Sequence, residues 1–364
     1  MKRTPLIEHH RKLNAHLVDF AGWEMPLQYG GVVEEYRAVR TAVGLFDVSH
    51  MGRITVEGRD AVSFLQHVTT NNVVKLSAGA AQYSMMCNPE GGIKDDVFVY
   101  RLGDRRFLLC VNASNREKIL SWLFTKSPQG DIRLSDESQD LAQIALQGPC
   151  SQAVLRVVCP DIADTLEPRH SAETEVFKIH CIVSRTGYTG EIGYELYVPF
   201  QSSGIVWAGL LEAGQGLGIK PCGLGARDLL RLDVGYLLYG NDIDEDTTPL
   251  EAGADWAVDL TKGEFIGRAP LLRQKEHGLS RTLIAFELTQ KAVPRHGMKI
   301  VSEEKVVRDI GVVTSGNLSP QLQKGIGLGY VPPEFAALGT KVLIDIRGRG
   351  HEAIVVRPPF YKRK

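Results

Sequence analysis

This 364-residue sequence lacks the features that mark membrane, secreted and nucleic-acid-binding proteins. No stretch approaches the ~18 consecutive apolar residues of a transmembrane helix. The first residues are followed by polar residues rather than by an apolar core, so we expect no secretory signal. A formal net charge of −1 gives no overall field that would attract nucleic acid or a membrane surface. We therefore expect a cytoplasmic protein without nucleic-acid or membrane partners.

Motifs for metal and nucleotide chemistry are also missing. The six cysteines are scattered without a C-x-x-C pair, which predicts reduced thiols and argues against a zinc site. The sequence has no HExxH, no Walker lysine motif and no G-x-S-x-G turn. Gly223 and Gly225 begin like a dinucleotide fingerprint, but the third glycine is absent and no clear strand leads into them. The run Asp242–Asp246 lacks the glycine of a calcium loop, so we interpret it as a solvated acidic turn. We expect no metal cofactor.

Strand and helix signals alternate along the first ~278 residues, and tight turns join several of the strands. Residues 97–102 and 107–111, for example, read as a hairpin over Gly103-Asp104. This pattern favours mixed or antiparallel α+β sheets over a doubly wound parallel sheet. After Gly278, short strands with Gly/Pro turns predict a small antiparallel β-barrel.

Two helix ends have clear sequence signals. The spacing of Val32, Tyr36 and Val39 predicts a helix over 32–43 that Gly44 terminates. The sequence Ser114–Glu117 predicts a capping box at the start of a later helix.

The stretch Asn88–Tyr100 combines a turn with two neighbouring carboxylates, Asp95 and Asp96. Pro89 and two glycines predict the turn, and the β-branched and aromatic residues after the carboxylates predict a strand. Neighbouring side chains on a strand point to opposite faces, so one carboxylate can point inward, where it must be paired, hydrogen-bonded or used. The alternative is that both carboxylates simply cap the turn.

Two further stretches have the composition of a ligand site. Ser184–Tyr197 gathers glycines, tyrosines and carboxylates, among them Glu195 at the start of a predicted strand. A glycine-rich hairpin without a ligand explains this stretch equally well. In the predicted helix 225–233, Arg227 and Arg231 share a face, either as intrahelical ion pairs or as a clamp for a ligand carboxylate. A carboxylate for an amidine-like edge, aromatic faces and an arginine for an acidic tail would suit a folate.

The ordered motifs of the chain resemble those of the glycine cleavage T-proteins, the aminomethyltransferase family. The resemblance spans nearly the whole chain. It rests on stretches 19–26, 44–52, 88–96, 184–195, 223–228, 239–245, 314–320 and 359–361.

The resemblance implies an α+β fold of three domains arranged as a cloverleaf around a central folate channel. Domain 1, which binds folate, would comprise residues 1–50 and 139–245. Domain 2 would comprise 51–138, with 246–278 packing across the domains. The C-terminal β-barrel would comprise 279–364.

The resemblance also implies the reaction and its residues. The aminomethyl carbon on the lipoyl arm of the H-protein would pass to tetrahydrofolate, giving ammonia, 5,10-methylenetetrahydrofolate and the dihydrolipoyl H-protein. Asp96 would be the catalytic carboxylate, with Asp95 supporting the turn from the other face. The folate and substrate site would contain Met51, Tyr83, Tyr188, Glu195, Arg227 and Tyr361.

Two alternatives remain open. One is a folate-dependent demethylation module acting on sarcosine or dimethylglycine, although such modules usually belong to longer chains with a flavin domain. The other is a folate-binding protein without transferase activity, against which the presence of both Asp96 and Glu195 argues.

Overall fold

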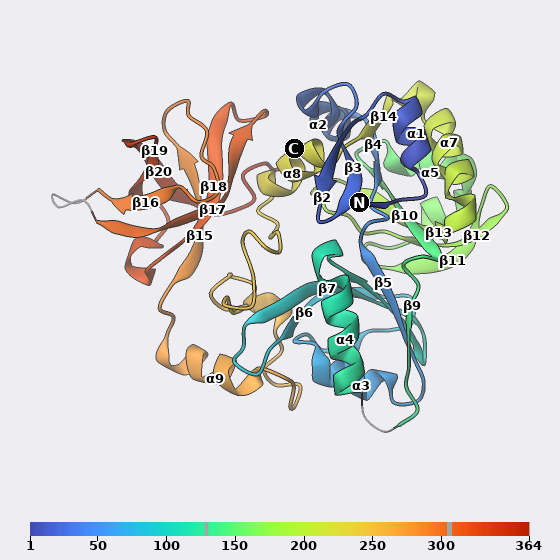
Figure 1. Cartoon of the computed structure of the whole chain (residues 1–364), viewed down its shortest axis with the longest axis horizontal. Coiled ribbons are helices and arrows are strands. Elements are labelled where there is room, and N and C mark those ends of the chain that lie inside the picture. Colours follow the sequence, from blue (N-terminus) through green and yellow to red (C-terminus); the bar gives the residue numbers. More distant parts are fainter. Residues whose placement is uncertain (128–129, 304–307, 364) are drawn as a thin grey trace. The chain divides into compact units, whose positions relative to one another are not determined.

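The computed structural model of the chain describes residues 1–127, 130–303 and 308–363 (Figure 1). The chain divides into two compact units. The first consists of Met1–Ser84 and Asp96–Asp228, and the second of Met85–Asp95 and Leu229–Lys364.

The first unit contains a six-stranded sheet with the strand order β11-β12-β13-β10-β4-β14. Its strands are β4 (Val43–Asp47), β10 (Leu141–Gln147), β11 (Ser171–Val176), β12 (Ile179–Ser184), β13 (Gly193–Pro199) and β14 (Ile219–Cys222). Only the β14–β4 pair is parallel among these pairings. An apolar core on one face of the sheet includes residues of α5 (Ser151–Val158), α6 (Pro160–Thr165) and α7 (Ser203–Ala213).

Strand alternation gives the two faces of this sheet different character. The core side of β10 and β13 carries Ala142, Ile144, Leu146, Tyr194, Leu196 and Val198. The opposite side carries Gln143, Gln147, Glu195 and Tyr197. The polar side chains of these two strands therefore gather on the face away from the core.

A small sheet at the N-terminus has the order β1-β3-β2. Its elements and the two helices near them are β1 (Lys2–Arg3), α1 (Ile7–Lys12), β2 (His16–Phe20), β3 (Trp23–Gln28) and α2 (Val32–Thr41).

A five-stranded sheet has the order β6-β7-β8-β5-β9. Its elements are β5 (Gly52–Glu57), α3 (Ala61–Val68), β6 (Ala81–Cys87), β7 (Ile93–Gly103), β8 (Arg106–Val111), α4 (Arg116–Lys126) and β9 (Arg133–Asp136). The pairing of β7 with β8 confirms the predicted hairpin. Tyr100, Leu108 and Cys110 from this sheet cluster with Ile182 and Tyr197 from the six-stranded sheet, so the polar face of β13 lies against β7 and β8.

The second unit contains a closed antiparallel barrel with the strand order β15-β18-β17-β16-β19-β20. The strands are β15 (Thr282–Leu288), β16 (Lys299–Ser302), β17 (Asp309–Ser319), β18 (Lys324–Val331), β19 (Lys341–Ile346) and β20 (Arg349–Val356). The helices α8 (Leu224–Asp233) and α9 (Arg268–His277) precede the barrel in the chain. The barrel and the mixed sheets confirm the predicted α+β class with a C-terminal β-barrel.

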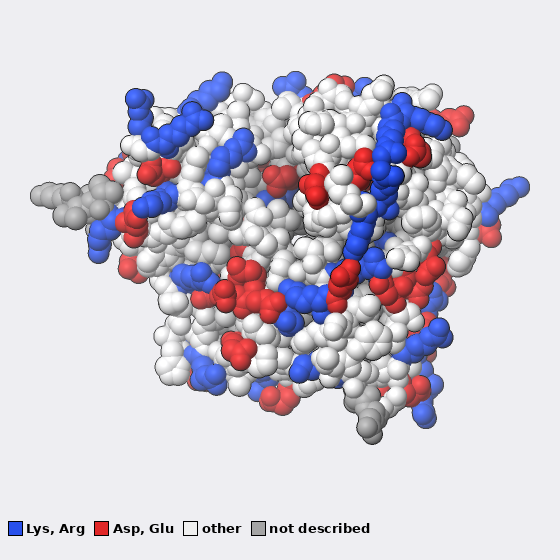
Figure 2. Space-filling view, viewed as in Figure 1, with Lys and Arg blue, Asp and Glu red and all other residues white. Residues whose placement is uncertain are grey.

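Short 3₁₀ helices complete the described secondary structure at Val73–Lys75, Ala113–Asn115, Phe200–Ser202, Gln215–Leu217, Asp255–Ala257 and Pro333–Phe335. None of the described helices is both long enough and apolar enough to cross a membrane. Basic and acidic side chains are interspersed on the face seen in Figure 2, in keeping with the net charge of −1.

The predicted end of the helix at Gly44 is wrong. Helix α2 stops at Thr41, and Gly44 lies within β4. A Cβ on Gly44 would come within 2.4 Å of Val39 and 2.8 Å of Cys222, so this glycine is needed for close packing rather than for a helix terminus.

Two other local predictions also fail. Helix α4 begins at Arg116 without a side-chain cap, and Glu117 pairs with Lys2 at 2.6 Å instead of forming a capping box. Strand β14 does lead directly into Gly223, contrary to expectation, and a Cβ there would lie 2.3 Å from the carbonyl oxygen of Leu27.

Candidate functional site

The carboxylate of Asp96 is held through both of its oxygens. Asp96 lies on β7, within the strand rather than in the preceding turn. The Tyr83 hydroxyl donates to Oδ2 at 3.0 Å, and the Asn112 amide donates to Oδ1 at 2.7 Å and to the Asp96 carbonyl at 3.2 Å. Asp96 is half-buried, whereas Asp95 is 0% exposed on the other face of the strand. Alternation thus separates the two aspartates, and Asp96 is the one beside Tyr83.

Asn112 has no obvious signal in the sequence. It directly follows β8, and β8 pairs with β7 in the sheet. A polar residue at the end of a predicted strand could have been found only by working out the register of the hairpin.

Glu195 is surrounded by neutral donors. Its Oε1 accepts from the Gln143 amide at 3.1 Å, and its Oε2 lies 2.5 Å from the Thr186 hydroxyl and 3.4 Å from that of Tyr100. None of the described residues places a cation within ion-pair distance of this carboxylate. Glu195 itself is half-buried, while Gln143 and Tyr100 are 1% and 0% exposed.

A second layer of polar groups supports these donors. Tyr197 lies 3.1 Å from the Tyr100 hydroxyl and 3.3 Å from the Gln143 amide. The Cys110 thiol lies 3.5 Å from Gln143 Oε1. Burial raises the pKa of Tyr100 and Tyr197 well above the ordinary phenol value and that of Cys110 to about 12, so these groups keep their protons.

Tyr188 and Arg227 stack on each other. The guanidinium carbon of Arg227 lies 4.6 Å from the centre of the Tyr188 ring, in the range of a cation–π contact. Near them His50 is 2% exposed, with its Nδ1 enclosed and without a hydrogen-bond partner among the described residues. Burial first, and then the charge of Arg227, lowers the pKa of His50 to about 3, so the imidazole is neutral.

The loop between β12 and β13 is fixed by groups beneath it. Arg40 donates to the Thr189 carbonyl at 2.7 Å and to Glu191 at 3.0 Å, and the two charged side chains are 3% and 0% exposed. A Cβ on Gly187 or Gly193 would lie 2.0 Å or 2.2 Å from the Gln147 amide group. These two glycines therefore leave room for Gln147, and not for a ligand as their composition suggested.

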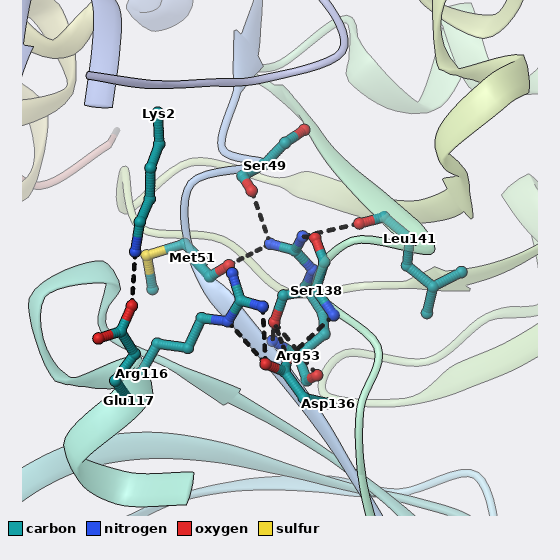
Figure 3. A network of polar contacts seen from close by, with 9 residues as sticks. All are labelled: Lys2, Ser49, Met51, Arg53, Arg116, Glu117, Asp136, Ser138 and Leu141. Carbon is teal, nitrogen blue, oxygen red and sulfur yellow. Dashed lines mark hydrogen bonds and ion pairs between the residues drawn. The ribbon is translucent and has the colours of Figure 1, made fainter. Parts of the chain in front are cut away.

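Met51 lies in a segment held by Arg53 (Figure 3). The Arg53 guanidinium is fully buried and donates to four backbone carbonyls, those of Ser49, Met51, Ser138 and Leu141. Its pKa is lowered to about 10 by burial, which leaves it charged at neutral pH. Arg53 joins the segment before β5 to the segment after β9, and so fixes the backbone of Met51.

Arg116 adds an ion pair at the same place. It binds Asp136 Oδ2 at 2.6 Å, and Asp136 Oδ1 accepts from Ser138 at 2.5 Å (Figure 3).

Tyr361 and Arg231 belong to the second unit. The Tyr361 amide donates to the Asp233 carbonyl at 2.9 Å. Arg231 binds Asp242 at 2.7 Å and Ser315 at 2.8 Å, and both charged residues are buried. Asp242 is buried, so the prediction that it lies in a solvated turn is wrong. A buried carboxylate needs a partner for its charge, and Arg231 is that partner. Arg231 therefore forms a buried structural ion pair. Of the two arginines that the sequence singled out, Arg227 is the one that stacks on Tyr188.

Two pairs of the expected residues are in contact, Tyr83 with Asp96 and Tyr188 with Arg227. The same compact unit also contains Met51 and Glu195. Sequence reasoning missed Asn112, Gln143, Thr186 and His50. The described residues contain no group of three or more His, Cys, Asp or Glu side chains that could hold a metal ion.

Two family matches cover most of the chain. The family described as the GCVT N-terminal domain matches residues 6–262, and the glycine cleavage T-protein C-terminal barrel domain matches residues 281–362.

Relatives and a solved structure match over the full length. A protein of Halothermothrix orenii named aminomethyltransferase is 48% identical, over 99% of this chain and 100% of its own length. One of the same name from Bacteroides thetaiotaomicron is 46% identical over 100% of both chains. The crystal structure of the glycine cleavage system aminomethyltransferase T from Bartonella henselae superposes with a TM-score of 0.92 at 35% identity, covering 99% of this chain and 98% of that one. The chain therefore belongs to the glycine cleavage T-protein family of aminomethyltransferases.

Proposed function

Starting from membership of this family, we propose that the protein transfers the aminomethyl carbon from the lipoyl arm of the H-protein to tetrahydrofolate. The products are ammonia, 5,10-methylenetetrahydrofolate and the dihydrolipoyl H-protein. The observation that supports this most directly is the pair of carboxylates Asp96 and Glu195, which lie on strands of one unit and are held by uncharged donors.

Glu195 is the proposed acceptor for the pterin ring. The 2-amino group and the N3–H of a pterin are two parallel donors, and a carboxylate is their natural partner. Tyr83, Tyr188 and Met51 are proposed to line the same pocket, because flat aromatic and thioether side chains pack well against a ring system. Arg227 and Tyr361 are the further proposed contacts to substrate.

Asp96 is the proposed proton acceptor. Two C–N bonds to the folate form, while the carbon loses its bonds to the amine nitrogen and to the sulfur of the arm. The folate gives up two N–H protons, of which one leaves with ammonia and the other with the thiol. A carboxylate held by Tyr83 and Asn112 can take up such a proton and stabilise iminium character on the carbon.

The rest of the rate would come from orientation. One reactant is held in the pocket and the other arrives on an arm, and fixing both removes much of the entropic barrier. This chemistry requires no covalent protein nucleophile.

The test is a reconstituted assay with aminomethylated H-protein and tetrahydrofolate. We expect ammonia and 5,10-methylenetetrahydrofolate in equal amounts. Turnover of sarcosine or dimethylglycine in place of the H-protein would favour the demethylation alternative. Folate binding without any transfer would favour a binding protein, and either outcome would overturn the proposal.

A further inference from the structure

Arg227 is a cation without an acceptor in the part of the chain that the structure describes. Its guanidinium stacks on Tyr188 at 4.6 Å, but none of the described residues pairs with its charge or accepts a hydrogen bond from its side chain. A guanidinium carries five N–H donors, and in this half-buried position they need oxygen partners. The stacking occupies the face of the guanidinium and leaves its N–H edge for another group.

His50 is a second polar side chain without a partner. It is 2% exposed, and its Nδ1 is enclosed and forms no hydrogen bond with the described residues. Nε2 has no partner among these residues either, but it is not enclosed, so this is the nitrogen that faces accessible space. The imidazole is neutral, because burial first and then the charge of Arg227 lower the pKa of His50 to about 3.

The position of the hydrogen on His50 follows from these surroundings. A neutral imidazole has a single N–H. An enclosed N–H without an acceptor is rarer in proteins than an enclosed acceptor without a donor. The hydrogen therefore belongs on Nε2, where a ligand can accept it. His50 and Arg227 are then both donors, and neither has an acceptor among the described residues.

Asp47, the carboxylate that is closest to His50 in the sequence, is not the missing acceptor. Its Oδ2 accepts from the Thr4 hydroxyl at 2.6 Å and lies 2.8 Å from His10 Nε2, and its Oδ1 accepts from the Ser49 amide at 2.9 Å. Asp47 therefore fixes the turn before His50 and is bound within the fold.

The backbone on both sides of His50 is held in place (Figure 3). The carbonyls of Ser49 and Met51 both accept from Arg53, the first at 2.8 Å. The Phe20 ring meets the imidazole edge to face, with 5.5 Å between the ring centres. The imidazole is thus oriented before a ligand arrives, which reduces the entropy that is lost on binding.

We propose that His50 is a substrate contact, and that its N–H and the guanidinium of Arg227 together bind a carboxylate of the tetrahydrofolate tail. This proposal rests on the proposed function, because it extends the role given there to Arg227. Of the two proposed reactants only the folate carries carboxylates, since the lipoyl arm is joined to its protein through an amide. A carboxylate offers two oxygens, one for each of the two donors.

The test measures the affinity for two probes by isothermal titration calorimetry. One is 5-formyltetrahydrofolate, and the other is its dimethyl ester, in which both tail carboxylates have lost their charge. We expect the wild-type protein to bind the acid about 10-fold or more tightly than the ester, the scale of a hydrogen bond to a charged group.

The central variants are His50→Phe and His50→Gln. Phenylalanine keeps a ring but has no N–H, so we expect His50→Phe to weaken binding of the acid about 10-fold and of the ester less than about threefold. Glutamine places an amide N–H close to the position of imidazole Nε2, so His50→Gln should keep most of the wild-type preference. This rescue separates a lost hydrogen bond from a change in packing.

A second contrast does not depend on the folding of His50→Phe. The amide of His50→Asn is one methylene shorter than that of His50→Gln and falls short of the Nε2 position. We therefore expect His50→Asn to lose the preference that His50→Gln keeps.

Tyr194→Phe is the matched control. It also removes a buried polar atom that has no partner among the described residues, but Tyr194 lies in the apolar core of the first unit. Both probes should bind to this variant as they bind to the wild type.

The outcomes separate this proposal from its premise. The proposed function stands and the proposal is overturned if the wild type transfers aminomethyl groups but binds acid and ester equally. The same conclusion follows if the folded His50→Phe and His50→Asn variants keep the preference or weaken both probes by the same factor. If the wild type binds neither probe and transfers nothing, the proposed function itself has failed.

Discussion

Two carboxylates of this protein, Glu195 in the first unit and Asp242 in the second, have very different surroundings. Asp242 is 1% exposed and receives Arg231 at 2.7 Å, the Thr314 hydroxyl at 2.5 Å and the Leu238 amide at 2.9 Å. Glu195 receives only uncharged donors from the described residues.

The difference lies in where the charge is compensated. The charge of Asp242 is balanced within the fold, and the barrel and the loop 236–243 are joined through it. The carboxylate of Glu195 is held only by the dipoles of uncharged amide and hydroxyl groups, and none of the described residues compensates its charge with a cation. A compensated buried charge points to a structural role, whereas a carboxylate in a neutral network points to a ligand.

Among the variants that test this difference between Asp242 and Glu195, Asp242→Ala should have the largest effect, a loss of unfolding free energy. The variant leaves Arg231 buried without its partner, which typically costs about 3–5 kcal/mol. Chemical denaturation should show this loss in the free energy of unfolding. Asp309→Ala is the control in the same barrel, because Asp309 forms an exposed pair with Lys299 and should cost less than about 1 kcal/mol. Equal losses in the two variants would contradict the structural role of Asp242.

Asp96, like Glu195, is held by uncharged donors, and the Asp96→Asn variant tests its proposed role as the proton acceptor. We expect turnover to fall by about 100-fold or more, the scale of general acid–base catalysis, with folate affinity largely unchanged. The glycine cleavage assay measures the turnover, and calorimetry measures the folate affinity. Asp104→Asn, at the exposed end of the same hairpin, should have the wild-type rate. A near-normal rate for Asp96→Asn would remove Asp96 from the mechanism.

Glu195→Ala should mainly weaken folate binding, whereas Asp242→Ala should mainly lower the free energy of unfolding. We expect folate affinity to fall by about 10-fold or more, because the pterin donors lose their charged acceptor. The loss of unfolding free energy should be smaller than in Asp242→Ala, since only uncharged donors are left without a partner. An unchanged affinity, measured by calorimetry, would show that Glu195 is not the pterin acceptor.

The smallest effect concerns His50, the neutral imidazole near Arg227. Its pKa is about 3 in the folded protein, below the ordinary value of 6.5, so between these values the unfolded chain binds more protons. Stability then rises with pH, and the contribution of His50 is complete above pH 6.5 and is lost as the pH falls toward 3. Between pH 7.5 and 5.5 the wild type should lose about 1 kcal/mol more unfolding free energy than His50→Gln. Parallel pH profiles would mean that His50 is not held neutral.

Local pattern was enough for most of the architecture. The turn chemistry at Gly103-Asp104 predicted the β7–β8 hairpin, and the short strands after Gly278 predicted the barrel. Local pattern failed where a residue serves a distant partner. Gly44 is small because Val39 and Cys222 press against it, and Gly187 and Gly193 are small because Gln147 lies beneath them.

The sequence by itself predicted Glu195 at the start of one strand and Asp96 next to the start of another, where neighbouring side chains point to opposite faces, because strand period is a local property. Only the tertiary structure decided which groups meet them. Gln143 reaches Glu195 because β10 pairs with β13 in a register that sets Gln143 opposite Tyr197, and Ser184 is opposite Glu195 through the pairing of β12 with β13. These partners are far apart in the chain, and no local pattern encodes a register between distant strands.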